Sequence, residues 1–197
     1  MSDPQTLAVY DAQADDYERM MHNEAAADPI WRSFVAACPK GGVVLDLGCG
    51  PGNYARLLAG EGLRVTALDA SPEMARRAGL IAGVTARHGF FEDVTEQDAY
   101  DGIWASFSLL HAPRDALPGH LTRLRDALKP GGTFFIGMKT GTGGGRDDLG
   151  RHYEYYSREE LEKLLQTAGF SPEQHWTGYG KGLSGQYDGW IVIHTNG

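Results

Sequence analysis

The chain has few cysteines and no long apolar segment. Its 197 residues include two cysteines, Cys38 and Cys49, which are too far apart for a CxxC pair and too few for a disulfide framework. No segment approaches the ~20 apolar residues of a membrane span, and the first residues lack the basic start and apolar core of a leader peptide. We therefore expect a soluble cytoplasmic protein without a membrane partner.

An excess of positive charge is also missing. The formal net charge is -8, whereas sequence-independent binding of nucleic acid needs a concentrated basic surface. The seven histidines include no i,i+4 pair and no HExxH spacing, so the sequence predicts no metal site. We expect a small-molecule partner and no nucleic-acid partner.

Short apolar runs alternate with segments of helical period, which is typical of βαβ units around a parallel sheet. Five strands are expected at residues 43–47, 64–70, 84–90, 101–110 and 133–138. A helix before the fifth strand is expected to stop at Pro130. Residues 141–150, rich in glycine, are interpreted as a long mobile connection.

The end of the chain has a different rhythm. Ser157 and Glu160 form a capping-box pattern, and Gly169 stands where a helix C-terminal cap belongs. Two aromatic-rich strands, near residues 170–177 and 186–195, are expected to form an antiparallel hairpin at the sheet edge. The sequence thus predicts an α/β fold.

The chain divides into residues 1–39, expected to form an N-terminal helical cap, and residues 40–197, expected to form one compact unit. Within the cap, Tyr10, Ala14, Tyr17 and Met21 recur at helical spacing and should share one helix face. This face could cover a ligand or simply pack on the protein.

The stretch VVLDLGCGPGNY, residues 43–54, places Gly48, Gly50 and Gly52 where the chain leaves a strand and enters a helix. Glycine there lets a ligand approach the main chain closely. The alternative is that positive backbone φ angles alone require these glycines.

Two acidic residues follow neighbouring strands. Asp69 ends the second expected strand, at the sheet edge where a carboxylate can accept both hydroxyls of a ribose. A helix cap is the alternative, but Ser71 and Pro72 already supply the cap and first-turn residues. Asp93 follows the third strand and could accept from an adenine amine, or be a solvated surface acid.

The motifs VVLDLGCGPGNY, ALDASPEM, GFFEDV, DGIWASFSLLHA and LKPGGTFFIG occur in this order over residues 40–195. They resemble the successive motifs of class I S-adenosylmethionine-dependent methyltransferases. Asn53 stands where the last glycine of the GxGxxG motif of nicotinamide-binding proteins would fall. The resemblance implies a Rossmann-like, three-layer αβα fold with a seven-stranded, mostly parallel sheet whose last strand is antiparallel.

The resemblance also implies roles for individual residues toward S-adenosylmethionine. The loop from Asp46 to Gly52 would pass under the methionine part, and Asp69 would bind the ribose. The other implied cofactor contacts are made by Ala70, Met74, Asp93 and Val94 at the adenine, Ser106 on the methyl side, and Tyr10 and Tyr17 as a cover. Met74 could equally be part of the core.

The sequence contains fewer indications of the residues that would contact the methyl acceptor. His111 follows the fourth strand at the ligand edge and is a candidate base or acceptor-positioning residue; a structural histidine closing the turn is the alternative. Arg146, Arg151 or His152 would bind an anionic group of the acceptor, with Tyr153 as a wall. Otherwise this segment is a solvated loop whose arginines are neutralised by Asp147 and Asp148.

These features together predict an enzyme that transfers a methyl group from S-adenosylmethionine to an oxygen, nitrogen or sulfur atom of a small molecule. Two rivals stay open. The first is a non-catalytic module that kept the fold, and the second is a nicotinamide-dependent oxidoreductase, which Asn53 opposes.

Overall fold

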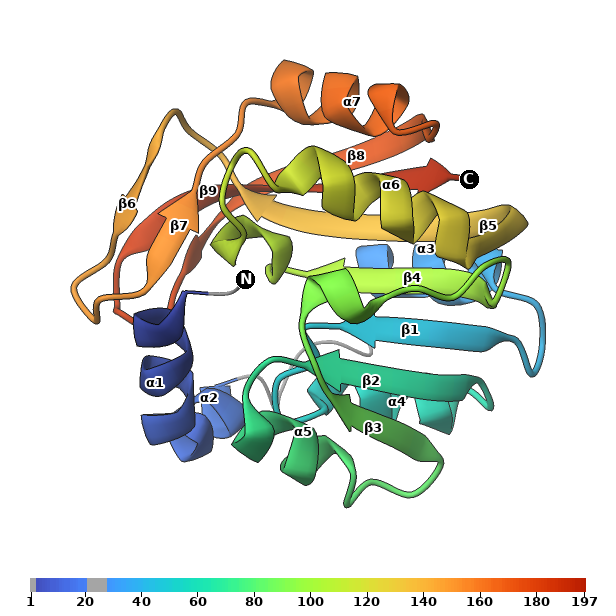
Figure 1. The fold of residues 1–197 in the computed structure, drawn as a ribbon, viewed down its shortest axis with the longest axis horizontal. Helices are drawn as coiled ribbons and strands as arrows, with labels where there is room; N and C mark the ends of the chain where they lie inside the picture. The colour runs from blue at the N-terminus through green and yellow to red at the C-terminus, as the bar shows by residue number, and fades with distance from the viewer. Residues whose placement is uncertain (1–2, 21–27) are drawn as a thin grey trace.

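A computed structural model of the chain describes residues 3–20 and 28–197. A seven-stranded sheet in the order β3-β2-β1-β4-β5-β9-β8 forms its centre (Figure 1). All pairs are parallel except those of β9, which runs antiparallel to both β5 and β8. The strands are β1 (Val43–Leu47), β2 (Arg64–Asp69), β3 (Val84–His88), β4 (Tyr100–Ser106), β5 (Leu128–Lys139), β8 (Ser171–Lys181) and β9 (Tyr187–Asn196).

Helices cover both faces of the sheet and make three layers. In Figure 1, α6 (Leu117–Ala127) and α7 (Arg158–Thr167) lie in front of the sheet, whereas α3 (Pro29–Ala37) and α4 (Asn53–Gly60) lie behind it. The short α5 (Pro72–Ala78) contributes Ala78 to the core on the α3 and α4 side. The predicted Rossmann-like architecture with one antiparallel strand is therefore confirmed.

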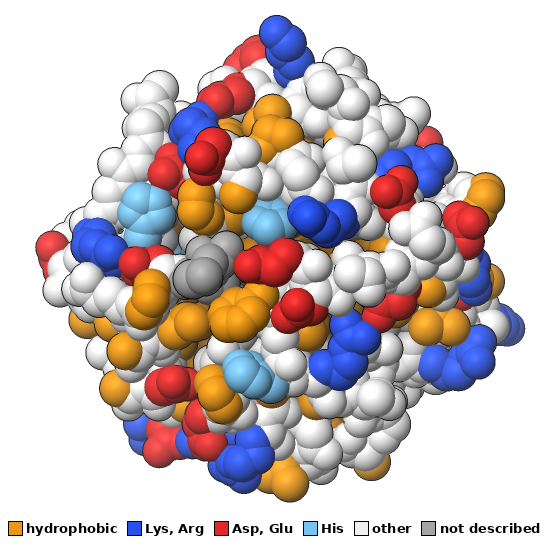
Figure 2. All heavy atoms as spheres, viewed as in Figure 1, with side chains coloured by type: hydrophobic (Ala, Val, Ile, Leu, Met, Phe, Trp, Pro, Cys, Tyr) orange, Lys and Arg blue, Asp and Glu red, His pale blue; other side chains and the backbone are white. Residues whose placement is uncertain are grey.

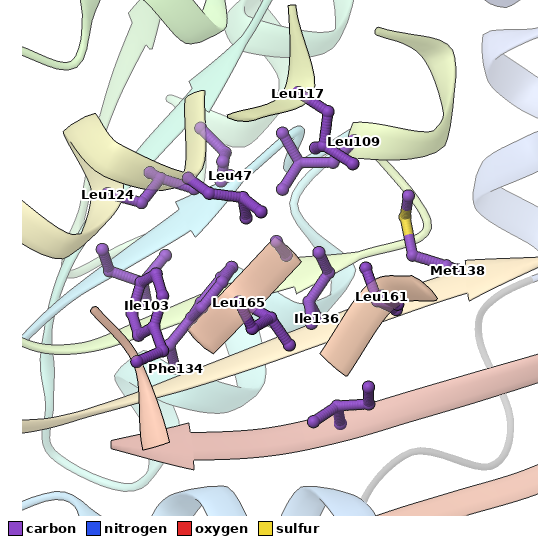
Figure 3. Close-up of a cluster of buried hydrophobic side chains, with 14 of the residues drawn as sticks. Leu47, Ile103, Leu109, Leu117, Leu124, Phe134, Ile136, Met138, Leu161 and Leu165 are labelled. Carbon is purple, nitrogen blue, oxygen red and sulfur yellow. The ribbon is translucent and has the colours of Figure 1, made fainter. Parts of the chain in front are cut away.

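The alternation of side chains along β4 and β5 builds the two halves of the core. Ile103 and Phe134 point toward α6 and α7, where the larger cluster includes Leu124 and Leu165 (Figure 3). Trp104, the next residue along β4, belongs to the opposite cluster. This half of the core places an indole ring beside the carboxyl ends of the strands.

The first two helices and a small hairpin gather at that edge of the sheet (left in Figure 1). They are α1 (Pro4–Ala12), α2 (Ala14–Met20), β6 (Gly144–Arg146) and β7 (His152–Glu154). Arg146 Nη1 donates to Asp3 Oδ2 at 2.8 Å, and the backbone N–H of His152 donates to Thr6 Oγ1 at 2.8 Å. The N-terminal helix is thereby joined to a segment some 140 residues further along the chain.

The structure corrects the prediction that residues 141–150 form a long mobile connection. Three of them pair as β6 with β7. Asp147 closes the turn between the two strands, because its Oδ1 accepts from the backbone N–H groups of Leu149 at 3.1 Å and Arg151 at 2.9 Å. A side-chain-to-backbone turn of this kind was not recognised among the glycines.

Two predicted boundaries also move. The helix expected to reach Pro130 ends at Ala127, because Leu128 already pairs with Tyr100 and starts β5. Helix α3, assigned to the cap at residues 1–39, packs through Phe34 against Trp104 and Phe135 in the sheet core. Helices α1 and α2 lie at the ligand edge, and the start of α3 reaches it through Ile30. Met21 of the predicted helix face lies outside the described residues.

The exposed face over α6 and α7 carries acidic and basic side chains interspersed with one another (Figure 2). Among the described helices, none has the length and apolar character needed to cross a membrane. Within residues 3–20 and 28–197, no three His, Cys, Asp or Glu side chains gather as a metal site.

Candidate functional site

The glycine loop joins β1 to α4. Gly48, Gly50 and Gly52 have φ angles of +70°, +53° and +93°, which non-glycine residues rarely adopt. A Cβ on Gly48 would lie 2.2 Å from Ser108 Cβ, whereas one on Gly50 would lie 3.2 Å from the Tyr17 ring. Packing alone therefore requires glycine at position 48, while Gly50 lies directly against the ring of Tyr17.

Asp69 ties the glycine loop to the end of β2. Its Oδ2 accepts from the Gly50 N–H at 2.8 Å, and its Oδ1 accepts from the Ser71 N–H at 2.8 Å. Ser71 itself caps α5, because its Oγ accepts from the Met74 N–H at 3.0 Å. Burial raises the pKa of Asp69, and each carboxylate oxygen keeps further acceptor capacity.

Asp46 lies beneath the same loop with an unsatisfied oxygen. The residue is 2% exposed, and its Oδ2 has no hydrogen-bond partner among the described residues. Burial, followed by the nearby charge of Asp69, raises the pKa of Asp46 to about 8. A buried acceptor without a donor is costly, so Asp46 is suited to a ligand that brings a donor or a positive charge.

A cavity of about 70 Å³, here called the glycine-loop cavity, opens beside these residues. Its lining includes Tyr10, Tyr17, Gly48, Gly50, Asp69, Met74, Phe91, Ser106, Phe107, Ser108 and His111. A smaller cavity next to it is lined by Asp46, Gly48 and Tyr54, among others.

A larger cavity of about 290 Å³, here called the aromatic cavity, lies on the side of β5 and β9. Four residues line both it and the glycine-loop cavity: Tyr10, Tyr17, Ser106 and Phe107. Its other walls include Tyr54, Trp104, Lys139, Arg151, Tyr153, Asp188, Trp190 and, at residues 180–183, the end of β8 with the start of the turn to β9. The two cavities are therefore neighbours that share a wall.

A chain of hydrogen bonds crosses this wall. His111 Nδ1 lies 2.6 Å from the carbonyl oxygen of His152, and Nε2 lies 2.9 Å from the Tyr10 hydroxyl. A carbonyl only accepts, so Nδ1 carries the proton and Nε2 accepts from the Tyr10 O–H. Arg151 Nη1 in turn donates to the Tyr10 oxygen at 3.0 Å.

The environment of His111 keeps its ring neutral. Burial lowers the pKa of His111 to about 4, against a raising contribution from the bond to His152, and Arg151 and Lys139 lower it further. His111 lines the glycine-loop cavity but not the aromatic cavity. The Tyr10 phenol therefore stands between His111 and any ligand of the aromatic cavity.

Two ion pairs stand at the aromatic cavity. Arg151, which is 2% exposed, donates through Nη2 to Asp147 Oδ2 at 2.6 Å, and Lys139 Nζ lies 2.6 Å from Asp188 Oδ2. Lys139 Nζ also lies 3.8 Å from the centroid of the Tyr153 ring, a cation–π arrangement. Both cations are thus already engaged by the protein.

Comparison with known proteins assigns the fold to a family. A family model described as a methyltransferase domain matches residues 17–175. The chain belongs to this methyltransferase family. With the motifs and sheet order above, it is a class I S-adenosylmethionine-dependent methyltransferase domain, and S-adenosylmethionine is the family's cofactor.

Several named relatives share this methyltransferase domain. A trans-aconitate 2-methyltransferase of Streptomyces avermitilis is 40% identical over 103 residues, covering 46% of this chain and 36% of the relative. A ubiquinone biosynthesis O-methyltransferase of Xanthomonas axonopodis pv. citri is 34% identical over 133 residues, covering 62% and 53%. This methyltransferase chain therefore aligns with only about a third to a half of the length of these relatives.

A solved structure covers the methyltransferase chain more completely. The 1,6-didemethyltoxoflavin-N1-methyltransferase of Burkholderia thailandensis, solved with bound 1,6-didemethyltoxoflavin and S-adenosylhomocysteine, superposes with a TM-score of 0.78. It is 25% identical and the match covers 98% of this chain and 87% of that one. Such extensive overlap includes the N-terminal helices as well as the sheet.

The residues of the methyltransferase site fit this cofactor. The unpaired Oδ2 of Asp46 could accept from a ligand ammonium group, and Asp69 retains acceptor capacity that ligand hydroxyl groups could use. Gly50 lines the cavity without a side chain, and Met74, which is 1% exposed, adds an apolar wall. Met74 thus lines the cavity and is buried at the same time.

Other residues expected at the cofactor lie away from the cavities. Val94 is fully buried in the core between the sheet and α6, and Ala70 lines neither cavity. Asp93 is exposed, and its Oδ2 accepts from the Phe90 N–H at 2.8 Å, so it caps the 3-10 turn Phe91–Asp93. Phe91, which was not named from the sequence, lines the glycine-loop cavity instead.

The four expected acceptor residues separate into two groups. Arg151 and Tyr153 line the aromatic cavity. Arg146 and His152 lie at an open outer groove, where Arg146 pairs with Asp3 and His152 Nε2 lies 3.0 Å from Glu154. The alternation of side chains along the β6–β7 hairpin accounts for this separation.

Several cavity residues had no role in the sequence interpretation, among them Trp104, Asp188 and Trp190. Trp104 lies two residues before Ser106 on β4 and so on the same face of the strand, a signal that was present in the sequence. Asp188 and Trp190 could be placed at the cavity only once the strand order was known, because β9 lies beside β5 only in the folded sheet.

Proposed function

We propose that this protein transfers a methyl group from S-adenosylmethionine to an oxygen, nitrogen or sulfur atom of a small molecule and releases S-adenosylhomocysteine. The observation that carries the proposal is the wall of Tyr10, Tyr17, Ser106 and Phe107 that the two cavities share. S-adenosylmethionine supplies an electrophilic methyl group. Methyl transfer is a displacement at this carbon, and holding the two reactants side by side supplies a large part of the rate acceleration.

Two carboxylates would hold the cofactor. Asp69 would accept from hydroxyl groups while it fixes the Gly50 backbone, and Asp46 would accept from an ammonium group. Both acids lie where burial raises their pKa. A positively charged ligand beside Asp46, whose pKa is raised to about 8, would favour its carboxylate form and so couple cofactor binding to proton release.

His111 would act as a positioning residue through Tyr10. Its Nε2 accepts from the Tyr10 hydroxyl, and its low pKa makes it a weak base near neutral pH. The pair would hold α1 over the cavities and fix the phenol at the shared wall. Arg151, which donates to the Tyr10 oxygen, and Tyr153, which packs on His111, would contact the acceptor from the same side of the aromatic cavity.

The relatives support a small acceptor. The names of the three proteins described above refer to trans-aconitate, to ubiquinone biosynthesis and to 1,6-didemethyltoxoflavin. The aromatic cavity, of about 290 Å³, has the size of a small-molecule site. These acceptors differ in chemistry, so the relatives support the class of reaction and the size of the substrate.

The test combines calorimetry with a turnover assay. We expect S-adenosylmethionine and S-adenosylhomocysteine to bind, NADH not to bind, and S-adenosylhomocysteine to accumulate with at least one compound of a small-molecule panel. Tight NADH binding would contradict the proposal in favour of an oxidoreductase. Cofactor binding without turnover on any acceptor would favour a non-catalytic module.

A further inference from the structure

Aromatic side chains make up much of the wall of the aromatic cavity. They come from both N-terminal helices, from β4 and its following loop, and from β7 and β9: Tyr10, Tyr17, Tyr54, Trp104, Phe107, Tyr153 and Trp190, with Tyr54 from α4. Benzene occupies an engineered cavity of about 150 Å³ in another protein. At about 290 Å³, this cavity has room for one or two fused rings.

The backbone of β8 holds one of these rings as a flat wall. Trp190 pairs across the strands with Gly178. A Cβ on Gly178 would lie 2.4 Å from Trp190 Cζ2, and one on Gly180 would lie 3.4 Å from Trp190 Cδ1. The indole therefore lies directly over two glycines, at a distance that only the absence of a side chain at position 178 permits.

A second indole of the same wall, that of Trp104, has an unpaired buried donor. Trp104 is 4% exposed, and its Nε1–H has no hydrogen-bond partner among the described residues. The indole nitrogen can only donate, and a buried donor left unpaired is costly. A ligand atom with a lone pair would satisfy it.

The charges at the cavity are balanced. Lys139 pairs with Asp188 and Arg151 with Asp147, and the rim adds one cation, Lys181, and one further acid, Asp28. Three positive side chains are thus matched by three negative ones. An anionic acceptor would have to compete with carboxylates that already hold the two buried cations.

We propose that the acceptor is a flat, uncharged aromatic or heteroaromatic compound of one or two rings with a lone pair that accepts from Trp104 Nε1–H. The rings would lie against Trp190, and the polar edge would face β4. This assignment rests on the proposed function, since it names the acceptor of that methyl transfer. It replaces the expectation of an anionic acceptor held by Arg146, Arg151 or His152.

The experiment uses four probes on the full chain saturated with S-adenosylhomocysteine, with affinities measured by calorimetry at pH 7.5. Quinoline and naphthalene have the same shape and differ in one lone pair. 1-Naphthoate adds a negative charge, and trans-aconitate is a non-aromatic polyanion. We expect quinoline to bind most tightly, followed by naphthalene, with both anions weaker than quinoline.

Trp104→Phe removes the N–H and keeps an aromatic ring. The affinity for quinoline should fall by about three- to tenfold, which is the effect of one neutral hydrogen bond. The affinity for naphthalene should change by less than about twofold. Trp176→Phe is the matched control, because Trp176 stacks on Phe135 and does not line the cavity. Gly178→Ala, which must displace the Trp190 ring, should weaken quinoline and naphthalene alike.

Several outcomes overturn the inference. Tighter binding of trans-aconitate or 1-naphthoate than of quinoline would do so. Equal affinity of the wild type for quinoline and naphthalene would also overturn it, and this measurement does not depend on whether any variant folds. Failure of S-adenosylhomocysteine to bind would instead contradict the proposed function. The two failures are therefore separate measurements.

Discussion

The Tyr10 hydroxyl donates to Nε2 of His111 across 2.9 Å, although the two residues are 101 positions apart. The bond joins the N-terminal helix α1 to the 3-10 turn Leu109–His111 after β4. It also occupies the only nitrogen of His111 that lacks a proton. Tyr10, and not His111, therefore presents a polar group to both cavities.

Removing the Tyr10 hydroxyl should destabilise the contact between α1 and the turn after β4. Tyr10→Phe leaves His111 Nε2 and Arg151 Nη1 without their partner, so we expect the free energy of unfolding to fall by about 1–3 kcal/mol. Urea denaturation measures the change. Tyr17→Phe is the matched control, since it removes a hydroxyl from the same wall outside this hydrogen-bond chain; equal effects of the two variants would contradict the account.

The buried His111 should make stability depend on pH. Its pKa falls from 6.5 to about 4 in the fold, so between these values the unfolded chain binds more protons than the folded chain. The free energy of unfolding should therefore fall as the pH drops from about 6.5 toward 4.

Urea titrations at several pH values in this window, compared with His111→Gln, isolate the contribution of the residue. The variant should show a shallower pH dependence than the wild type. His175→Gln, at an exposed position, is the control and should keep the wild-type slope. Identical slopes for wild type and His111→Gln would show that the ring titrates normally in the folded protein.

The sequence predicted the sheet and the glycine loop well because both depend on local patterns. Strand periodicity, the cap at Ser71 and the glycines at 48–52 are visible within a few residues of one another. Gly48 shows the limit of this approach, because its closest neighbour, Ser108, lies sixty residues away.

The acceptor side was harder to predict because long-range pairing builds it. Arg151 was named as an anion-binding residue, yet its guanidinium is held by Asp147 and the Tyr10 oxygen. Trp190 enters the cavity only because β9 lies between β5 and β8. The pairing of Arg151 with Asp147 was the alternative that the sequence left open, whereas the contact of Arg151 with Tyr10 and the position of Trp190 cannot be read from spacing along the chain.

Cofactor binding should release a proton at Asp46. The pKa of this carboxyl is raised to about 8 without ligand, so at pH 7 it is mostly protonated, and an ammonium group beside Oδ2 would favour the carboxylate. The binding enthalpy of S-adenosylhomocysteine at pH 7 should therefore differ between phosphate and Tris buffers. Asp46→Asn should abolish the difference, and an equal wild-type enthalpy in both buffers would argue against this role.

Asp69 should contribute directly to cofactor affinity. Asp69→Ala removes the acceptor of the Gly50 and Ser71 N–H groups together with the charge-assisted bonds to ligand hydroxyls. We expect affinity to fall by about 30- to 100-fold, with Asp69→Asn intermediate because it keeps one oxygen. Calorimetry with S-adenosylhomocysteine measures both, and unchanged affinity in Asp69→Ala would remove this residue from the site.

The central claim is that methyl transfer takes place at the wall shared by the two cavities. The most direct measurement is a single-turnover assay with S-adenosylmethionine labelled in its methyl group, excess enzyme and a panel of flat heteroaromatic acceptors. The account predicts that label appears on an acceptor as S-adenosylhomocysteine forms, and that Asp69→Ala slows both together. Retention of all label on the cofactor, despite saturating cofactor binding and a broad acceptor panel, would contradict it.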